Sequence, residues 1–247
     1  MKWLIAIGDG THFAGQSAWA ALSQLAAPRE TIRQLYQILI GSLLLGTIAG
    51  IALGAVVWMH TYGVLQRSGT QDYLPTVLAA AVLLELAPIG AGLIIAARTG
   101  ASLGAELGAM KLGEQLDALQ LLGLSPMQVL VGPRVLACMV ALPLLHIFIA
   151  ALALISGYFA ENVVSSTTWL RYQTACFQEL RLNEVVLAAM KTIVFGFLIA
   201  VASCRAGMLA QGGTEGVGKA ATQAVVASSL LVLAGDVLLV ALIQLIT

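Results

Sequence analysis

Charged side chains are scarce in this sequence, and their scarcity limits the class of protein it can form. Only 10% of the 247 residues are charged, whereas 60% are hydrophobic, and the mean hydropathy is +0.94. A soluble domain carries about 25% charged residues, which cover its water-facing surface. The sequence therefore predicts an integral membrane protein. The formal net charge of zero gives no bulk electrostatic attraction to nucleic acid.

Cysteine and histidine are also few, and their placement argues against a redox, metal or hydrolytic centre. The cysteines are odd in number and widely spaced, which fits neither a disulfide framework nor a metal site; they are Cys138, Cys176 and Cys204. The histidines, at positions 12, 60 and 146, are scattered as well. The cytoplasmic loops carry no Ser/His or His/Asp/Glu constellation. We therefore expect no catalytic domain, no metal and no cofactor in this chain.

Long apolar runs dominate what is present. A membrane-spanning helix needs about 20 mostly apolar residues, and five segments qualify: 36–59, 76–97, 134–160, 184–204 and 221–246. Residues 12–28 mix apolar and polar side chains and predict an interfacial amphipathic helix that Pro28 ends, with a soluble helix or tail as the alternative. The sequence thus predicts an all-α, polytopic protein, with residues 1–247 forming one transmembrane domain.

The basic residues set the direction of the spans, because Lys and Arg concentrate in cytoplasmic loops. An N-terminus inside places eight of them on the cytoplasmic side: Lys2, Arg29, Arg33, Arg98, Lys111, Arg134, Arg205 and Lys219. The outer side then keeps Arg67, Arg171 and Arg181. Five spans with this bias predict a cytoplasmic N-terminus and a periplasmic C-terminus.

Residues 98–133, between the second and third spans, form the largest cytoplasmic insertion. Gly100, Gly104 and Gly108 recur every four residues, a spacing that lets another helix approach closely. Leucines at 112, 116, 119 and 122 then make one apolar helical face, and Glu114, Gln115 and Asp117 lie off it. Such a helix can dock into a groove on a cytoplasmic partner or lie flat on the membrane, and the residues alone leave both open.

Several short motifs make the sequence similar to a known family. They are Glu-Leu-Ala-Pro at 85–88, Ala-Arg-Thr-Gly-Ala at 97–101, and the segments 105–111, 114–119, 133–137, 212–222 and 224–226 with Asp236. In this order, over about residues 30–246, they resemble the MlaE-type permeases, the membrane subunits of ABC transporters that act on lipids with MCE-domain proteins. Leu84 stands where that family usually has Arg, and Ala87 replaces its Gly.

The resemblance implies both an assembly and a site. Residues 106–122 would be the coupling helix, with Glu106, Glu114, Gln115 and Asp117 meeting a separate cytoplasmic ATPase subunit. The implied partners are a second copy of the chain, a periplasmic MCE-domain protein and a STAS-type cytoplasmic subunit. The implied activity is the movement of phospholipid-like lipids between the bacterial inner membrane and the MCE partner, in support of outer membrane lipid asymmetry.

One segment resembles a nucleotide site without completing it. Residues 213–220 read Gly-Thr-Glu-Gly-Val-Gly-Lys-Ala, close to the P-loop pattern G-x-x-x-x-G-K-[ST]. A P-loop needs a Ser or Thr hydroxyl for Mg²⁺ and a preceding strand, but here the hydroxyl position is Ala220 and the preceding segment is a span. We predict a flexible cytoplasmic turn there and expect ATP hydrolysis on another chain.

Three ionisable residues fall inside predicted spans: Glu85, Lys191 and Asp236. At 1.5 Å per residue, all three lie roughly 10–15 Å below the outer surface. Such groups are costly in hydrocarbon and usually face a cavity or one another. We predict a polar cluster that borders the lipid cavity; a static tie between helices is the alternative. An ion-coupled secondary carrier built on these residues is the competing function, but the internal repeats common in that class are missing.

The first span carries Gly46, Gly50 and Gly54 at four-residue spacing. Small residues repeated in this way form a close-packing surface. The stripe could serve a homodimer interface, packing within one subunit, or a smooth wall for acyl chains. The sequence favours packing.

Overall fold

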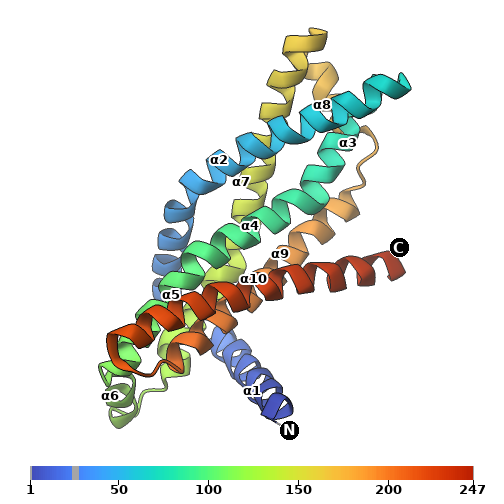
Figure 1. The fold of residues 1–247 in the computed structure, drawn as a ribbon. Helices are drawn as coiled ribbons and strands as arrows, with labels where there is room; N and C mark the ends of the chain where they lie inside the picture. The colour runs from blue at the N-terminus through green and yellow to red at the C-terminus, as the bar shows by residue number, and fades with distance from the viewer. Residues whose placement is uncertain (1, 24–27, 247) are drawn as a thin grey trace.

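The computed structural model describes residues 2–23 and 28–246, and these form helices and short connections without a strand (Figure 1). Five helical segments in this part of the chain are long and apolar enough to cross a membrane. They are Arg29–Ser68, Gln71–Leu112, Met127–Ser165, Leu182–Met208 and Gly213–Leu245. The prediction of an all-α protein with five spans is therefore confirmed.

The second span is one long helix built from several pieces. The 3₁₀ turn η2 (Gln71–Tyr73) leads into α3 (Leu74–Ala81), η3 (Val82–Leu86), α4 (Ala87–Ile95), η4 (Ala96–Gly100) and α5 (Ala101–Leu112). Both η3 and η4 are π-helical turns. The helix continues through residues 98–112 into the bundle, so the predicted span end at residue 97 coincides with no helix end and stays a prediction.

Neighbouring helices explain why the second span continues so far. An added Cβ would lie 3.0 Å from the Ser203 hydroxyl at Gly100, 2.7 Å from Ala224 at Gly104 and 3.3 Å from Ala210 at Gly108. These partners lie on or next to α9 (Leu182–Met208) and α10 (Gly213–Ile246). The glycine stripe is thus a packing face, and it holds α5 inside the bundle.

The glycines of α2 (Arg29–Ser68) lie against α7 (Gly132–Ser165), which follows the π-helical turn η5 (Met127–Val131). An added Cβ at Gly46 would be 3.0 Å from Leu145, and at Gly50 it would be 2.9 Å from the carbonyl oxygen of Ile149. At Gly54 it would overlap the backbone of Ala153. Of the three roles considered for this stripe, the contacts match close packing within one subunit.

The N-terminal helix differs in extent from its prediction. α1 covers Lys2–Ser23 and packs against η5 and α7. Its start at residue 12 was wrong, because Gly8 and Gly10 are tolerated inside the helix, where each glycine costs only about 1 kcal/mol relative to alanine. The predicted helix extends through residues 24–27, which lie outside the described residues, to Pro28, but Pro28 is the N-cap of α2. Whether α1 lies in the membrane interface stays a prediction.

The connections mark two ends of the bundle (Figure 1). The short helix α6 (Gln115–Leu121) lies at one end and α8 (Trp169–Gln178) at the other, here called the α6 end and the α8 end. The near-P-loop, residues 213–220, lies within the first turns of α10. Gly212 and Gly213 have positive φ angles of 92° and 67°, but the chain is helical from Gly213 onward. The predicted turn is therefore limited to these two glycines.

Candidate functional site

The three ionisable residues of the spans lie together in the structure. The Lys191 ammonium on α9 is 2.7 Å from Oε2 of Glu85 and 3.0 Å from Oδ1 of Asp236. Glu85 comes from the π-helical turn η3 and Asp236 from α10. One cation thus joins three spans through two carboxylates, and we call this group the Lys191 cluster.

Burial within the Lys191 cluster is uneven. The side chain of Lys191 is 3% exposed and that of Asp236 is 11% exposed, whereas that of Glu85 is 43% exposed in the single chain. A buried ion pair is expensive to break, because the remaining charge loses its compensation. Lys191 is therefore the buried centre of the cluster. Glu85 is the member whose side chain is partly exposed in the single chain and accessible to a ligand or a second subunit.

Proline explains the unusual turn that carries Glu85. A proline inside a helix lacks the N–H that would bind the carbonyl four residues earlier, and its ring crowds that carbonyl. Pro88 lies two residues after the end of η3, and π turns are a common way to accommodate such a disruption. In the π register of this turn, the Ala87 N–H binds the carbonyl of Val82 five residues earlier. Pro88 therefore leaves the carbonyl of Leu83 without a donor, and Nε2 of His146 from α7 approaches that carbonyl at 3.2 Å. The local fold that presents Glu85 is thus supported from the neighbouring span.

The predicted coupling helix over 106–122 is wrong in its extent. α5 ends at Leu112, and Glu114 adopts a left-handed conformation with φ of 56° before α6 begins at Gln115. A non-glycine residue in this conformation is uncommon and breaks a helix. The ammonium of Lys111 lies 3.1 Å from Asp117 across the break. The segment is therefore a tight corner followed by a two-turn helix.

This corner separates the four predicted coupling residues into two groups. Glu106 lies on α5, where a carboxylate oxygen is 2.6 Å from the Arg134 guanidinium. Glu114, Gln115 and Asp117 are exposed on the corner and on α6. Leu116 is buried and anchors the short helix. The acidic edge predicted for docking is thus confined to α6, and Glu106 belongs to a different environment.

Two leucines near the end of α6 add an apolar element to this edge. Leu121 is 90% exposed and Leu122 is 75% exposed. Exposed apolar side chains of this kind are typical of a contact with a partner protein or with the membrane. The apolar face predicted across Leu112, Leu116, Leu119 and Leu122 is therefore divided, with Leu116 turned inward and Leu122 outward.

The region matched by known proteins includes both of these sites. A family model described as Permease MlaE matches residues 31–242. The chain belongs to the MlaE permease family. The resemblance recognised from the motifs is confirmed, and the protein is a multi-pass membrane permease of the ABC transporter type.

Relatives of this MlaE-family permease are found in bacteria and a plant. A probable ABC transporter permease protein of Rickettsia typhi is 36% identical over 212 residues, which cover 86% of this chain and 82% of the relative. A probable ABC transporter permease protein of Synechocystis is 33% identical over 206 residues, covering 82% and 77%. The chloroplastic protein TRIGALACTOSYLDIACYLGLYCEROL 1 of Arabidopsis thaliana is 32% identical over 215 residues, covering 87% and 61%.

This MlaE-family permease departs from the motif at the Lys191 cluster itself. Leu84 takes the position before Glu85 where the resemblance has Arg, so that position adds no second cation. Lys191 is consequently the ammonium that both carboxylates contact.

A further polar tie, which the sequence reasoning missed, joins α2 and α7 near the α8 end. The Trp58 indole N–H donates to Oε2 of Glu161 at 2.7 Å, and the Ser165 hydroxyl donates to Oε1 at 2.6 Å. Glu161 is buried. Trp58 and Glu161 are 103 positions apart in the sequence, so the periodicity of either helix could not reveal their contact.

Proposed function

We propose that this permease is the membrane subunit of an ATP-driven ABC transporter that moves phospholipid-like lipids between the inner membrane and a periplasmic MCE-domain partner. The observation that carries the proposal is the continuity of the second span. One helix runs from Glu85, in the Lys191 cluster, to Leu112, directly before the exposed corner and α6. A force applied to α6 therefore reaches the charged group inside the bundle.

The ATPase is proposed as a separate cytoplasmic chain that binds α6. Glu114, Gln115 and Asp117, together with Leu121 and Leu122, supply a mixed polar and apolar surface of the kind that a groove on a partner recognises. The near-P-loop supports the proposal that another chain hydrolyses ATP, because its lysine, Lys219, forms an ion pair with Glu215 within α10, at 2.7 Å. The proposed orientation then places the α6 end and the N-terminus in the cytoplasm.

A homodimer is proposed from the exposure of Glu85. In the single chain this carboxylate is 43% exposed at membrane depth, and a charge facing hydrocarbon is unfavourable. A second copy of the chain would enclose it and could form a lipid cavity between the two subunits. A lipid substrate is also supported by the name of the Arabidopsis relative, which contains the name of a lipid. A STAS-type subunit remains a proposed further partner of the ATPase.

Co-purification tests the assembly. The tagged permease, co-expressed with the genes beside its own, is expected to retain an ATPase in mild detergent. Loss of that ATPase in a Glu114→Lys variant that still elutes as folded protein would support docking through α6. A wild-type complex that never retains an ATPase would contradict the proposal.

The Lys191 cluster also favours the second candidate, an ion-coupled carrier, because it places two carboxylates on one cation. The two functions differ in their energy source. Lipid transfer from proteoliposomes to a soluble acceptor should stop without ATP and ATPase if the first holds. Transfer that continues without them and follows an imposed ion gradient would favour the carrier.

A further inference from the structure

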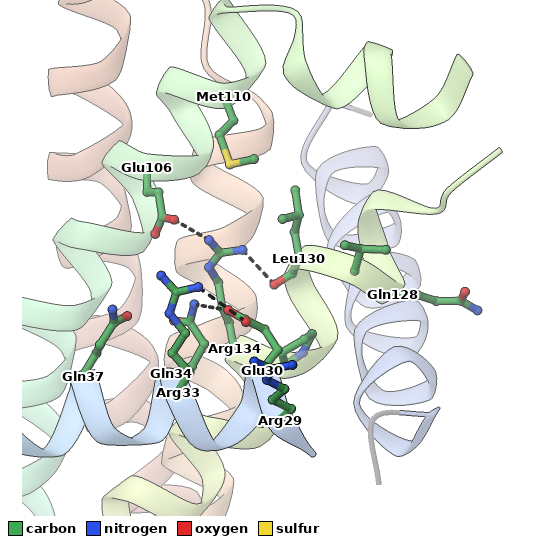
Figure 2. Close-up of a pocket in the computed structure, with 12 residues that line it drawn as sticks. Arg29, Glu30, Arg33, Gln34, Gln37, Glu106, Met110, Gln128, Leu130 and Arg134 are labelled. Atoms are coloured by element: carbon green, nitrogen blue, oxygen red, sulfur yellow. Dashed lines mark hydrogen bonds and ion pairs between the residues drawn. The ribbon is translucent and has the colours of Figure 1, made fainter. Parts of the chain in front are cut away.

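A polar cleft of about 1130 Å³ opens at the α6 end, away from the Lys191 cluster. Figure 2 shows that it lies between the start of α2, the last turns of α5, and η5 with the start of α7. Three arginines line it, Arg29 and Arg33 from α2 and Arg134 from α7, together with Glu30 and Glu106. The positive charges outnumber the negative ones by one.

Arg134 gives the cleft a fixed cationic wall. Its side chain is 4% exposed; one guanidinium nitrogen donates to Glu106 at 2.6 Å and another to the carbonyl of Leu130 at 2.9 Å. The buried Nε–H has no hydrogen-bond partner among the described residues. The Nε–H is itself inaccessible, so Arg134 contributes a fixed positive charge to the wall of the cleft rather than a free donor.

The arginines of α2 are held less tightly. Arg33 reaches Glu30 only at 3.8 Å, and Glu30 also accepts a hydrogen bond from Gln34 at 3.2 Å. Arg29 forms no ion pair with any described residue. Exposed arginines on a helix start can adjust their side chains, and guanidinium groups bind phosphate oxygens in a bidentate manner. The cleft therefore combines one fixed cation with two adaptable ones.

A second groove, of about 570 Å³, continues from this cleft along α2. It shares Gln34, Gln37 and Glu106 with the cleft and then runs between Ile38 and Ile40 of α2 and Leu103 of α5. Arg98 also lines it, with the guanidinium packed over Gly41. The groove adds the apolar side chains of Ile38, Ile40 and Leu103 to the polar cleft, and Thr99, Ser102 and Arg98 also line it.

We propose that the cleft and groove bind an anionic phospholipid of the cytoplasmic leaflet, with its phosphate on Arg29, Arg33 and Arg134 and an acyl chain along the groove. Basic clusters at the cytoplasmic end of spans attract anionic lipid. A soluble protein segment could reach the polar cleft, but the groove along Ile38 and Ile40 lies within the first span, where an acyl chain is the natural occupant.

This site contains no residue of the Lys191 cluster and depends on the proposed function only for its orientation. Binding requires neither the ATPase nor turnover. A failure of the assembly or of transport therefore leaves the lipid test unaffected, and a failure of the lipid test leaves the transport proposal standing.

The test uses the purified full chain in nanodiscs and native mass spectrometry to count retained lipids. Wild-type protein in nanodiscs of phosphatidylethanolamine with added phosphatidylglycerol is expected to retain phosphatidylglycerol selectively. The double variant Arg29→Gln/Arg33→Gln should lose about tenfold or more in that affinity, the effect of one lost charge-assisted hydrogen bond. The matched control, Arg67→Gln, changes an arginine at the other end of the same helix and should retain the lipid as wild type does.

Two further measurements keep the outcome decisive. Equal retention of phosphatidylglycerol by wild type and double variant would overturn the proposal, including the case in which an acidic protein segment fills the cleft instead. Inorganic phosphate, titrated calorimetrically, should bind far more weakly than the lipid. Equal affinity would show that the groove contributes nothing to binding and would overturn the proposal that the ligand is a phospholipid. If the double variant does not fold, Arg33→Lys is used, and retention equal to wild type would then count against bidentate binding of phosphate.

Discussion

The Lys191 cluster and the cleft at the α6 end use the same kinds of side chain in opposite ways. In the cluster one buried ammonium contacts two carboxylates at 2.7 and 3.0 Å, so the cation is fully compensated. In the cleft three arginines meet two glutamates, and the Arg33–Glu30 pair is 3.8 Å apart. Tight compensation favours a fixed geometry between helices, whereas incomplete compensation favours the binding of an added anion.

The largest effect should come from removing the cation of the cluster. Lys191→Met leaves Glu85 and Asp236 without compensation inside the bundle, and breaking a buried pair costs about 3–5 kcal/mol. We expect a marked fall in the thermal unfolding temperature of the detergent-solubilised protein. Lys219→Met, which alters an exposed lysine on α10, should leave that temperature nearly unchanged.

A triple variant then separates structure from function at the cluster. Lys191→Met combined with Glu85→Gln and Asp236→Asn removes all three charges, so much of the lost stability should return. Lipid transfer should remain abolished if the charges act in transport. Transfer that recovers together with stability would show the cluster to be only a tie between helices.

Packing between α2 and α7 should be the next most sensitive. An added methyl group at Gly54 overlaps the backbone of Ala153, which cannot move aside as a flexible side chain can, so Gly54→Ala should destabilise by about 1–3 kcal/mol. Gly63→Ala lies on the same helix with no atom within 4 Å and should be neutral or slightly stabilising. Equal unfolding temperatures for the two variants would refute the close contact between α2 and α7.

The smallest effect on stability belongs to the open α6 end. Glu114→Lys reverses an exposed charge beside α6, and we expect no change in unfolding temperature but about a tenfold loss of ATPase affinity, as for one lost charge-assisted contact. Surface binding kinetics with the purified ATPase would measure it. Glu179→Lys, next to α8 at the opposite end, is the control, and a similar loss there would argue against docking at α6.

The five spans and the Lys191 cluster could both be predicted from the sequence, for different reasons. Apolar runs of sufficient length identify spans directly, since hydrocarbon tolerates few alternatives. Glu85, Lys191 and Asp236 could be grouped because depth in a membrane follows from counting residues along a helix. In a soluble protein no membrane defines a common depth for residues on different helices, so the same three sequence positions would not have predicted that the side chains lie close together.

The α6 corner and the cleft could not be obtained in this way. Glu114 takes a left-handed conformation that a glutamate rarely adopts, and the adjacent Gly113, with φ of −86°, does not need its conformational freedom. Arg29, Arg33 and Arg134 were counted as topology signals one by one, and only the packing of α2 against α7 brings them together. The signal that existed was Pro88, whose missing N–H predicts a local disruption beside Glu85.

The two π-helical turns in the second span have a geometric consequence. A π turn accommodates one extra residue, and each residue of an α-helix advances about 100° around the axis; η3 and η4 together thus shift the phase of α5 relative to α3 by about 200°. On one side of them Leu78 packs on Gly157 and Thr76 donates to the carbonyl of Ala175. On the other side Gly104 meets α10. A regular helix could not keep both registers, so the same irregularity that aims Glu85 also lets one span match two sets of neighbours.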